Sequence, residues 1–359
     1  MLSTNAPRAE ILAGCTRFFG HAPQTMQQRF RALASTVSAE ERPDRYGGGD
    51  MLEAFEEQIA VLLGKEAAVF MPSGTMAQQI ALRIHAEDSV NDRVALHPQS
   101  HLVVAEEDAY QQLSGLRGIQ LGERNRLFAL DDLRAAREPF GSILIELPER
   151  NIGGALRSWE ELHQLCAWAR DHCVRLHMDG ARLWESQPFY GRSHADISAL
   201  FDSVYVSFYK GLDAIAGAAL AGEKAFVERA RLWQHRHGGR MVQLFPFVIS
   251  ARDGLKRYLK RMPDYVRRAR EIARIIRDVG LTVTPDPPPT NMMHVYLRGD
   301  AKIFDATMVE LARDRKIRLF NSLRATDTPS VHMFELNVAE AAFAISNQEI
   351  EEMFSRLAG

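Results

Sequence analysis

The middle of the chain alternates short apolar runs with stretches in which apolar residues recur at helical spacing. Leu52, Phe55 and Ile59 show that spacing after Asp50-Met-Leu-Glu53, a sequence typical of a capping box. The apolar runs are bounded by turn residues and predict strands over 67–70, 93–96, 143–146, 174–178, 204–207 and 216–221. This alternation is typical of an α/β fold, with a mainly parallel sheet flanked by helices on both faces.

Two further helices are predicted within this region. One covers 75–85, directly after the break Pro72-Ser73-Gly74, and the other is opened by a second capping box, Ser158-Trp-Glu-Glu161. After Phe247 the pattern changes. An Arg-rich helical pattern over 254–278 leads to a loop of several prolines, which cannot form a helix or a central strand.

The remaining residues predict strands over 292–297, near 317–320 and near 332–338, with a helix after the first and a terminal helix. We therefore expect an N-terminal segment over 1–44, a large domain over 45–247 and a smaller C-terminal α+β domain over 248–359.

Composition narrows the class of protein. The 359 residues include 44 Lys and Arg against 46 Asp and Glu, which gives no basic face for a nucleic acid. No apolar stretch approaches the roughly 20 residues of a membrane helix. Cys15, Cys166 and Cys173 form no Cys-x-x-Cys pair, so neither disulfides nor a metal site are expected. We expect a cytoplasmic protein without nucleic-acid or membrane partners.

Two charged residues follow predicted strands. Asp179 comes directly after the strand over 174–178, and Lys210 follows the strand over 204–207. In open α/β sheets ligands bind at the carboxyl ends of strands, and the interval of 31 residues (210 − 179) allows one helix and one strand between the two residues. A lysine at the end of a buried strand is costly unless its amine is used, as in a Schiff base. A helix-capping Asp179 and a turn lysine beside Gly211 are the alternative interpretations.

A third feature is Ser73-Gly74-Thr75 at the start of the predicted helix over 75–85. Backbone N–H groups at a helix N-terminus bind phosphate, and two hydroxyls assist, although Ser73 could also be a simple N-cap. Pyridoxal 5'-phosphate requires a phosphate site, a lysine, and a carboxylate that keeps the ring nitrogen protonated. Arg182, three residues after Asp179, lies within reach of the phenolic oxygen of the same ring.

Several motifs resemble the threonine aldolase / β-eliminating lyase family of enzymes that use pyridoxal phosphate. They are Tyr46-Gly-Gly-Gly, Leu62-Leu-Gly-Lys-Glu-Ala-Ala, Phe70-Met-Pro-Ser-Gly-Thr-Met76, His177-Met-Asp-Gly-Ala-Arg-Leu183, Phe201-Asp-Ser-Val, Tyr209-Lys-Gly-Leu and His237-Gly-Gly. The similarity covers about 46–239. It implies the fold type I (aspartate aminotransferase-like) architecture and a homodimer or homotetramer with active sites at the subunit interface.

The resemblance also implies roles for individual residues. Ser73, Gly74 and Thr75 bind the phosphate, Asp179 the pyridine nitrogen and Arg182 the phenolic oxygen. Lys210 forms the Schiff base and His101 stacks on the ring; a solvated loop histidine is the alternative. Arg240, within the basic segment Gln234-His-Arg-His-Gly-Gly-Arg240, is expected to complete the phosphate site of a neighbouring subunit.

The residues that contact the substrate depart from the family pattern. Glu149 stands where the family has a histidine, and a basic residue of the Gly-Gly-Gly-Met-Arg-Gln motif has moved to Arg240. The segment that usually supplies an arginine for the substrate carboxylate reads Pro329-Ser-Val-His332-Met-Phe-Glu335, and the N-terminal Ser-Asp-Thr stretch is not recognisable. The cofactor residues therefore match the family pattern, whereas the substrate residues depart from it.

The leading hypothesis is a lyase that cleaves the Cα–Cβ bond of a β-hydroxy-α-amino acid, with His101 or Glu149 as the base. Lys210 carries the cofactor and Asp179 keeps its ring nitrogen protonated. A carboxylate base needs burial or a neighbouring anion to raise its pKa, and Arg150 works against that.

Three alternatives stay open. The first is β-elimination or another lyase reaction on an amino acid. The second is a binding protein that keeps the fold without catalysis. The third is a nicotinamide-dependent enzyme, which would need a Gly-x-Gly-x-x-Gly fingerprint after its first strand, and the sequence has none.

Overall fold

The computed structural model describes residues 6–359, which form two compact units. One unit comprises 26–261, and the other joins the residues up to Thr25 to 262–359. The predicted boundary after residue 247 therefore falls inside a helix, α12 (Phe245–Tyr258), which belongs wholly to the first unit. The predicted segment 1–44 is divided at Thr25, because β1 (Arg17–Phe18) pairs with β11 (Ile317–Arg318).

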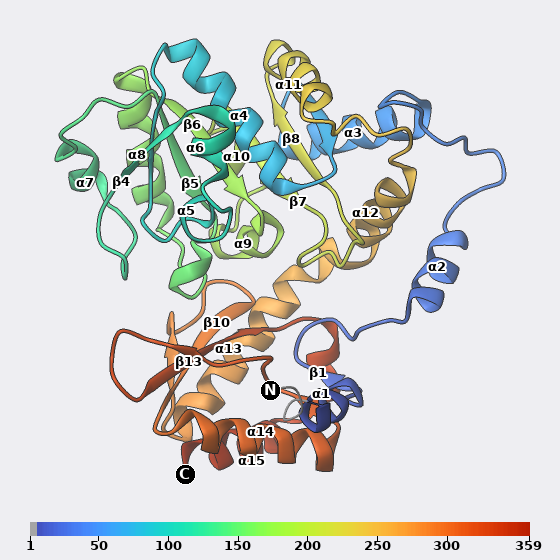
Figure 1. Ribbon diagram of the computed structural model, residues 1–359, viewed down its shortest axis with the longest axis vertical. Coiled ribbons are helices and arrows are strands. Elements are labelled where there is room, and N and C mark those ends of the chain that lie inside the picture. The colour runs from blue at the N-terminus through green and yellow to red at the C-terminus, as the bar shows by residue number, and fades with distance from the viewer. Residues whose placement is uncertain (1–5) are drawn as a thin grey trace. The chain divides into compact units, whose positions relative to one another are not determined.

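Among the described residues, unit 26–261 is built on a seven-stranded sheet with the order β2-β8-β7-β6-β5-β3-β4. Figure 1 shows this sheet with its helices packed around it. The strands are β2 (Ala67–Met71), β3 (Arg93–Leu96), β4 (Arg117–Gln120), β5 (Ser142–Glu146), β6 (Arg175–Gly180), β7 (Ser203–Ser207) and β8 (Ala218–Gly222). β3 to β7 form parallel pairs, whereas β8 runs antiparallel to both β7 and β2. The sheet is thus mainly parallel, as the α/β pattern predicts.

The sequence pattern missed two features of this sheet. β4 has a mixed, partly exposed surface at the sheet edge, so it lacks the apolar run that marks the other strands. The reversed direction of β8 is also not visible in the pattern, because periodicity reports burial and not the direction of pairing. All five residues of β8 are buried between its neighbours, and four of them are Ala or Gly.

Helices cover both faces of the sheet, and the alternation along β2 shows how. Val69 and Met71 pack with α4 (Gly74–Ser89) and α11 (Lys224–Arg236) in one apolar cluster. Phe70 points to the other face, where its ring lies 6.1 Å from that of Phe55 on α3 (Asp50–Leu63). The other helices of this unit are α2 (Met26–Ala34), α5 (His101–Val104), α6 (Ala109–Ser114), α7 (Leu130–Arg134), α8 (Trp159–Asp171), α9 (Leu183–Tyr190), α10 (His194–Ser198), η1 (Arg150–Ile152) and η2 (Leu259–Arg261).

The two predicted capping boxes differ in outcome. Ser158 and Glu161 form the predicted box at the start of α8. At α3 the prediction was wrong by one residue: Gly49 is the N-cap, and its N–H donates to the Glu53 carboxylate over 3.1 Å. The N-cap of α4 is Ser73, whose hydroxyl accepts a hydrogen bond from the Met76 N–H over 3.2 Å.

The helix predicted over 254–278 is also wrong as a single element. It is divided into the end of α12, η2 and α13 (Met262–Asp278). The cause is Pro263, which has no N–H to donate to the carbonyl of Leu259 and is tolerated in the first turn of a new helix.

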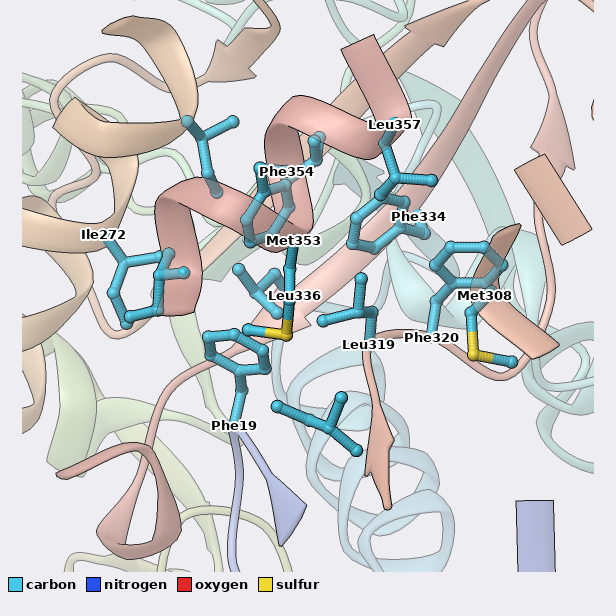
Figure 2. Close-up of a cluster of buried hydrophobic side chains, with 14 of the residues drawn as sticks. Phe19, Ile272, Met308, Leu319, Phe320, Phe334, Leu336, Met353, Phe354 and Leu357 are labelled. Carbon is cyan, nitrogen blue, oxygen red and sulfur yellow. The ribbon is translucent and has the colours of Figure 1, made fainter. Parts of the chain in front are cut away.

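The second unit combines helices with a four-stranded antiparallel sheet, in the order β12-β13-β10-β9 within the described residues. Its elements are α1 (Ala6–Ala13), α13, β9 (Thr282–Thr284), β10 (Met292–Arg298), α14 (Ala301–Arg315), β11, β12 (Arg324–Ala325), β13 (Val331–Asn337), η3 (Glu340–Ala344) and α15 (Asn347–Ala358). Figure 2 shows its core, where Phe354 of α15 and Phe334 of β13 lie among other buried side chains. This is the predicted α+β composition.

Candidate active site

Three neighbouring parallel strands of unit 26–261 end at one edge of the sheet with polar residues. Glu146 ends β5, and Asp179 is its register partner near the end of β6. Lys210 follows the end of β7 by three residues. Lys210, Asp179 and Glu146 are close enough to shift one another's pKa, so these residues share one site. The crossover spacing predicted this arrangement for Asp179 and Lys210.

Asp179 is buried, with 4% of its surface exposed. One carboxylate oxygen, Oδ1, accepts the Ala181 N–H over 2.9 Å, and the other, Oδ2, accepts the Gln78 side-chain amide. Burial raises the pKa of Asp179, while Lys210 and the hydrogen bond from the Ala181 N–H favour the charged form. The carboxylate is therefore held in place by donors on two sides.

The Lys210 amine lies in a half-buried position on the connection from β7 to β8. The connection is closed by hydrogen bonds from the Phe208 N–H to the Gly217 carbonyl (3.1 Å) and from the Ala214 N–H to the Phe208 carbonyl (2.9 Å). Burial, followed by the Arg182 guanidinium, lowers the pKa of Lys210, whereas Asp179 opposes that shift. A lowered pKa increases the fraction of neutral amine that can attack a carbonyl.

The start of α4 is shaped by a close contact. A β-carbon on Gly74 would lie 2.0 Å from the hydroxyl oxygen of Tyr205, so this position accepts glycine alone without movement of the tyrosine. The Tyr205 hydroxyl also lies 3.4 Å from that of Tyr209. The N-terminus of this 16-residue helix, at Ser73, Gly74 and Thr75, offers backbone N–H groups to an anion.

His101 begins α5 and is anchored by two carboxylates. Its Nδ1 lies 3.0 Å from Oε1 of Glu106, and its backbone N–H donates to Glu146. The hydrogen bond to Glu106 raises the pKa of His101. Glu106 is buried, and it also accepts hydrogen bonds from Thr75 (3.2 Å) and Gln79 (3.1 Å). The imidazole is thereby tied to the start of α4.

Glu146 and Glu149 form a buried carboxyl pair. Burial, followed by the nearby Asp179, raises the pKa of Glu146 to about 7. Burial raises the pKa of Glu149 well above its usual value, and Glu146 adds to the shift while Arg157 opposes it. The condition for a carboxylate base, burial together with a neighbouring anion, is thus met at Glu149.

Arg182 and Arg240 have different surroundings. Arg182 lies near Glu185, a buried carboxylate whose pKa is raised by burial and lowered by that guanidinium. A β-carbon on Gly211 would lie 2.2 Å from the Glu185 carboxylate, which places Glu185 beside the residue that follows Lys210. Arg240 is exposed, and its Nε donates to the Tyr46 carbonyl of the same chain. The structure does not bring Arg240 together with the strand-end residues.

Sequence reasoning missed Gln78, Glu106 and Tyr205. Gln78 carried a usable signal, because it lies seven residues before His85 on the same face of α4, and a buried helix face with polar residues needs partners. Glu106 and Tyr205 carried none, since their contacts join residues far apart in the chain.

The arrangement can hold a ligand with three features: an anionic group at the start of α4, a carbonyl carbon within reach of Lys210, and a protonated nitrogen against Asp179. Over residues 6–359, no three His, Cys, Asp or Glu side chains are grouped so as to hold a metal ion. In the same part of the chain, no helix is long and apolar enough to cross a membrane.

Comparison with known proteins agrees with this geometry. The family model described as beta-eliminating lyase matches residues 28–300. The chain is 29% identical to low-specificity L-threonine aldolase 1 of Arabidopsis thaliana, over 74% of this chain and 77% of that protein. It is 31% identical to aldolase vrtJ of Penicillium aethiopicum, over 76% of this chain and 71% of that protein.

A solved structure extends the similarity to nearly the whole chain. The crystal structure of a candidate L-allo-threonine aldolase from Listeria monocytogenes EGD-E superposes with a TM-score of 0.93 and 38% sequence identity. The match covers 98% of this chain and 99% of that one. The chain therefore belongs to the threonine aldolase / beta-eliminating lyase family and is an enzyme of the lyase class.

Proposed function

We propose that the chain is a pyridoxal-phosphate-dependent lyase that cleaves the Cα–Cβ bond of a β-hydroxy-α-amino acid to glycine and an aldehyde. One observation carries this proposal. Lys210, whose pKa is lowered, and the buried carboxylate of Asp179 lie close together at the ends of neighbouring strands. The names of the relatives, threonine aldolases, support the same substrate class.

The residues of the site fit this cofactor. Gly74 makes room for the Tyr205 hydroxyl at the start of α4, and Ser73, Gly74 and Thr75 would bind the phosphate through the N–H groups of this helix end. Asp179 would accept a hydrogen bond from the ring nitrogen, Arg182 would donate to the phenolic oxygen, and Lys210 would hold the aldehyde carbon covalently. His101 would stack on the ring. In a homodimer or homotetramer, Arg240 would serve the phosphate site of the neighbouring subunit.

Each residue then has a task that its surroundings support. When bound, the cofactor supplies an electron sink for the pair released when the Cα–Cβ bond breaks. Asp179 keeps the ring nitrogen protonated, which requires this carboxylate to stay ionised. Lys210 would hold the cofactor, and its lowered pKa would keep part of the amine neutral, which is the form that attacks a carbonyl carbon.

A carboxyl of the Glu146 and Glu149 pair suits the role of the base that takes the β-hydroxyl proton better than His101 does. The contact with Glu106 raises the pKa of His101, so this imidazole is more often protonated near neutral pH. Burial and the Glu146 carboxylate raise the pKa of Glu149, so the ionised form of this carboxyl is a stronger base than an ordinary glutamate. We therefore assign Glu149 as the base and His101 to ring stacking.

Replacing Glu149 by glutamine is expected to lower kcat by about 10²- to 10⁴-fold with little change in KM, because a general base acts mainly in the transition state. In the wild type, activity should rise with pH as Glu149 loses its proton, since burial and the Glu146 carboxylate raise the pKa of Glu149 well above its usual value. Steady-state kinetics across pH 5–9 tests both points.

His101→Asn and Glu146→Gln are the matched controls. The first should weaken cofactor stacking in either case, and the second should move the rising limb of the pH profile to lower pH, since the anion beside Glu149 is lost. A Glu149→Gln enzyme with an unchanged rate but altered substrate preference would make Glu149 a pocket residue. A Glu149→Gln enzyme with an unchanged rate and an unchanged substrate preference would place Glu149 outside the site.

A panel of β-hydroxy amino acids tests the reaction itself. Glycine and one aldehyde should form in equal amounts from the true substrate. The description of the family model as beta-eliminating lyase favours a second candidate, β-elimination from an amino acid with a leaving group at Cβ. A β-substituted alanine would then give pyruvate and ammonia, and no glycine.

The proposal includes a cytoplasmic homodimer or homotetramer. Its support is the family resemblance together with exposed apolar side chains in α2, where Met26 is 81% and Phe30 62% exposed. Phe30 also lines an apolar groove of about 830 Å³ that includes Phe245 and Ile249 of α12. A surface of this kind is typical of protein contacts.

A further inference from the structure

A chain of polar side chains runs through the interior of unit 26–261 and ends on Asp179. Its members lie on α4, β6 and β7, and each is at most 4% exposed. Buried polar groups of this number require mutual hydrogen bonds. In order, the chain consists of His85, Ser203, His177, Gln78 and Asp179.

The links are short and continuous. His85 Nε2 lies 2.6 Å from Ser203 Oγ, which lies 2.7 Å from His177 Nδ1. On the other side of the same ring, His177 Nε2 lies 2.8 Å from Gln78 Oε1. The Gln78 amide nitrogen donates to Asp179 Oδ2. Each ring nitrogen of His177 therefore has one partner.

The direction of hydrogen bonding follows from the last link. Because the Gln78 amide nitrogen donates to Asp179, its carbonyl oxygen must accept, and His177 Nε2 must carry a proton. Burial lowers the pKa of His177 well below its usual value, so the ring is neutral and Nδ1 accepts from the Ser203 hydroxyl. Ser203 Oγ in turn accepts from His85 Nε2, and burial lowers the pKa of that ring to about 3.

The opposite direction would require a protonated Asp179. Its hydroxyl would donate to Gln78, and every later link would reverse, so that His85 carried its proton on Nδ1. That nitrogen is buried and has no hydrogen-bond partner among the described residues. A buried N–H without a partner is costly, whereas an unprotonated nitrogen without one is less so. The arrangement therefore favours the direction that ends in an ionised carboxylate.

Other charged groups also act on Asp179. Lys210 and His101 favour its ionised form, whereas Glu106, Glu146 and Glu149 favour the protonated form. Near His85, Arg175 and Arg229 favour the neutral ring. The hydrogen-bond chain favours the ionised form of Asp179 as well, and it does so through Gln78 from the interior of the unit.

We propose that Gln78, His177, Ser203 and His85 form a one-directional hydrogen-bond chain that positions Asp179 and keeps it ionised for the cofactor. The four residues are positioning residues, because they act through Asp179. The inference rests on the proposed role of Asp179 and goes beyond it, since it assigns the cause of that ionisation to side chains on α4 and β7.

The cofactor-free protein offers a direct test. With ¹⁵N-labelled histidine, NMR should show His177 neutral and protonated on Nε2 at all pH values between 5 and 9, and His177→Asn identifies its signals. In Ser203→Ala the unprotonated Nδ1 loses its donor, so its ¹⁵N signal should move toward that of a nitrogen without a hydrogen bond while Nε2 stays protonated, and Ser203→Thr should restore the wild-type signal. A His177 protonated mainly on Nδ1 in the wild type would overturn the proposal.

Activity of the loaded enzyme gives the second readout. Gln78→Met keeps the side-chain length but removes the donor to Asp179, and kcat at pH 7 should fall about tenfold or more. At acid pH, below the limb set by Glu149, this variant should lose further activity that the wild type keeps, because a carboxylate that loses a donor is protonated more easily. Ser203→Ala should show the same loss to a smaller extent.

Ser250→Ala is the matched control. Its hydroxyl is also buried and accepts the Ile215 N–H over 2.8 Å, so thermal stability should fall without any change in the pH profile. If Gln78→Met and Ser203→Ala behave in the same way, the chain is purely structural and the inference fails. If Asp179→Asn keeps full turnover, the role proposed for Asp179 at the ring nitrogen is wrong, whatever the other variants show.

Discussion

Replacing Lys210 by alanine is expected to lower turnover by at least about 10⁴-fold, because the residue that holds the cofactor covalently and releases the product is lost. The wild-type protein, loaded with the cofactor, should absorb visible light. Borohydride reduction followed by peptide mapping should place the phosphopyridoxyl group on Lys210.

Lys65 provides the control for this experiment. Burial also lowers the pKa of Lys65, and its amine donates to the Phe201 carbonyl over 2.5 Å, but this residue lies where β7 begins. Lys65→Ala should reduce thermal stability and leave labelling of Lys210 unchanged. Label on Lys65, or on any lysine other than Lys210, would contradict the assignment.

Asp179→Asn is expected to reduce kcat by about 10²- to 10³-fold, since one preorganised charge at the electron sink is removed. Its thermal stability should fall modestly, because asparagine has one acceptor oxygen where Asp179 accepts hydrogen bonds from both Ala181 and Gln78. Parallel measurements of kcat and Tm on the cofactor-free and loaded protein test both directions. Lower stability with a normal rate per folded molecule would assign Asp179 to helix capping.

The strands and the main site residues were predictable because their signals are local. Runs such as 204–207 are apolar over their whole length, and Lys210 or Asp179 stands out as a charge directly after such a run. The rule that ligands bind at the carboxyl ends of parallel strands then joins residues that lie 31 positions apart. The fold class follows from the same alternation of strands and helices.

The remaining features depend on contacts that no local pattern records. Gln78 and Asp179 are 101 residues apart, and His85 and Ser203 are 118 residues apart, so their pairing appears only in the folded chain. The burial that makes Glu149 a suitable base is also a property of the fold, because only the folded chain encloses this carboxyl. In sequence, Glu149 beside Arg150 is indistinguishable from a surface pair.

The antiparallel strand β8 has a consequence for synthesis of the protein on the ribosome. β2 lies at the edge of the sheet and pairs with β8, yet β2 is made early and β8 late. While residues 72–222 are being made, the apolar sequence Ala67-Ala-Val-Phe-Met71 lacks its native partner, although the parallel strands between them emerge in order. An unpaired apolar strand is a site for association with other chains. The nascent chain therefore needs shielding of β2, by a chaperone or by early docking of α3 and α4, until residue 222 has left the exit tunnel.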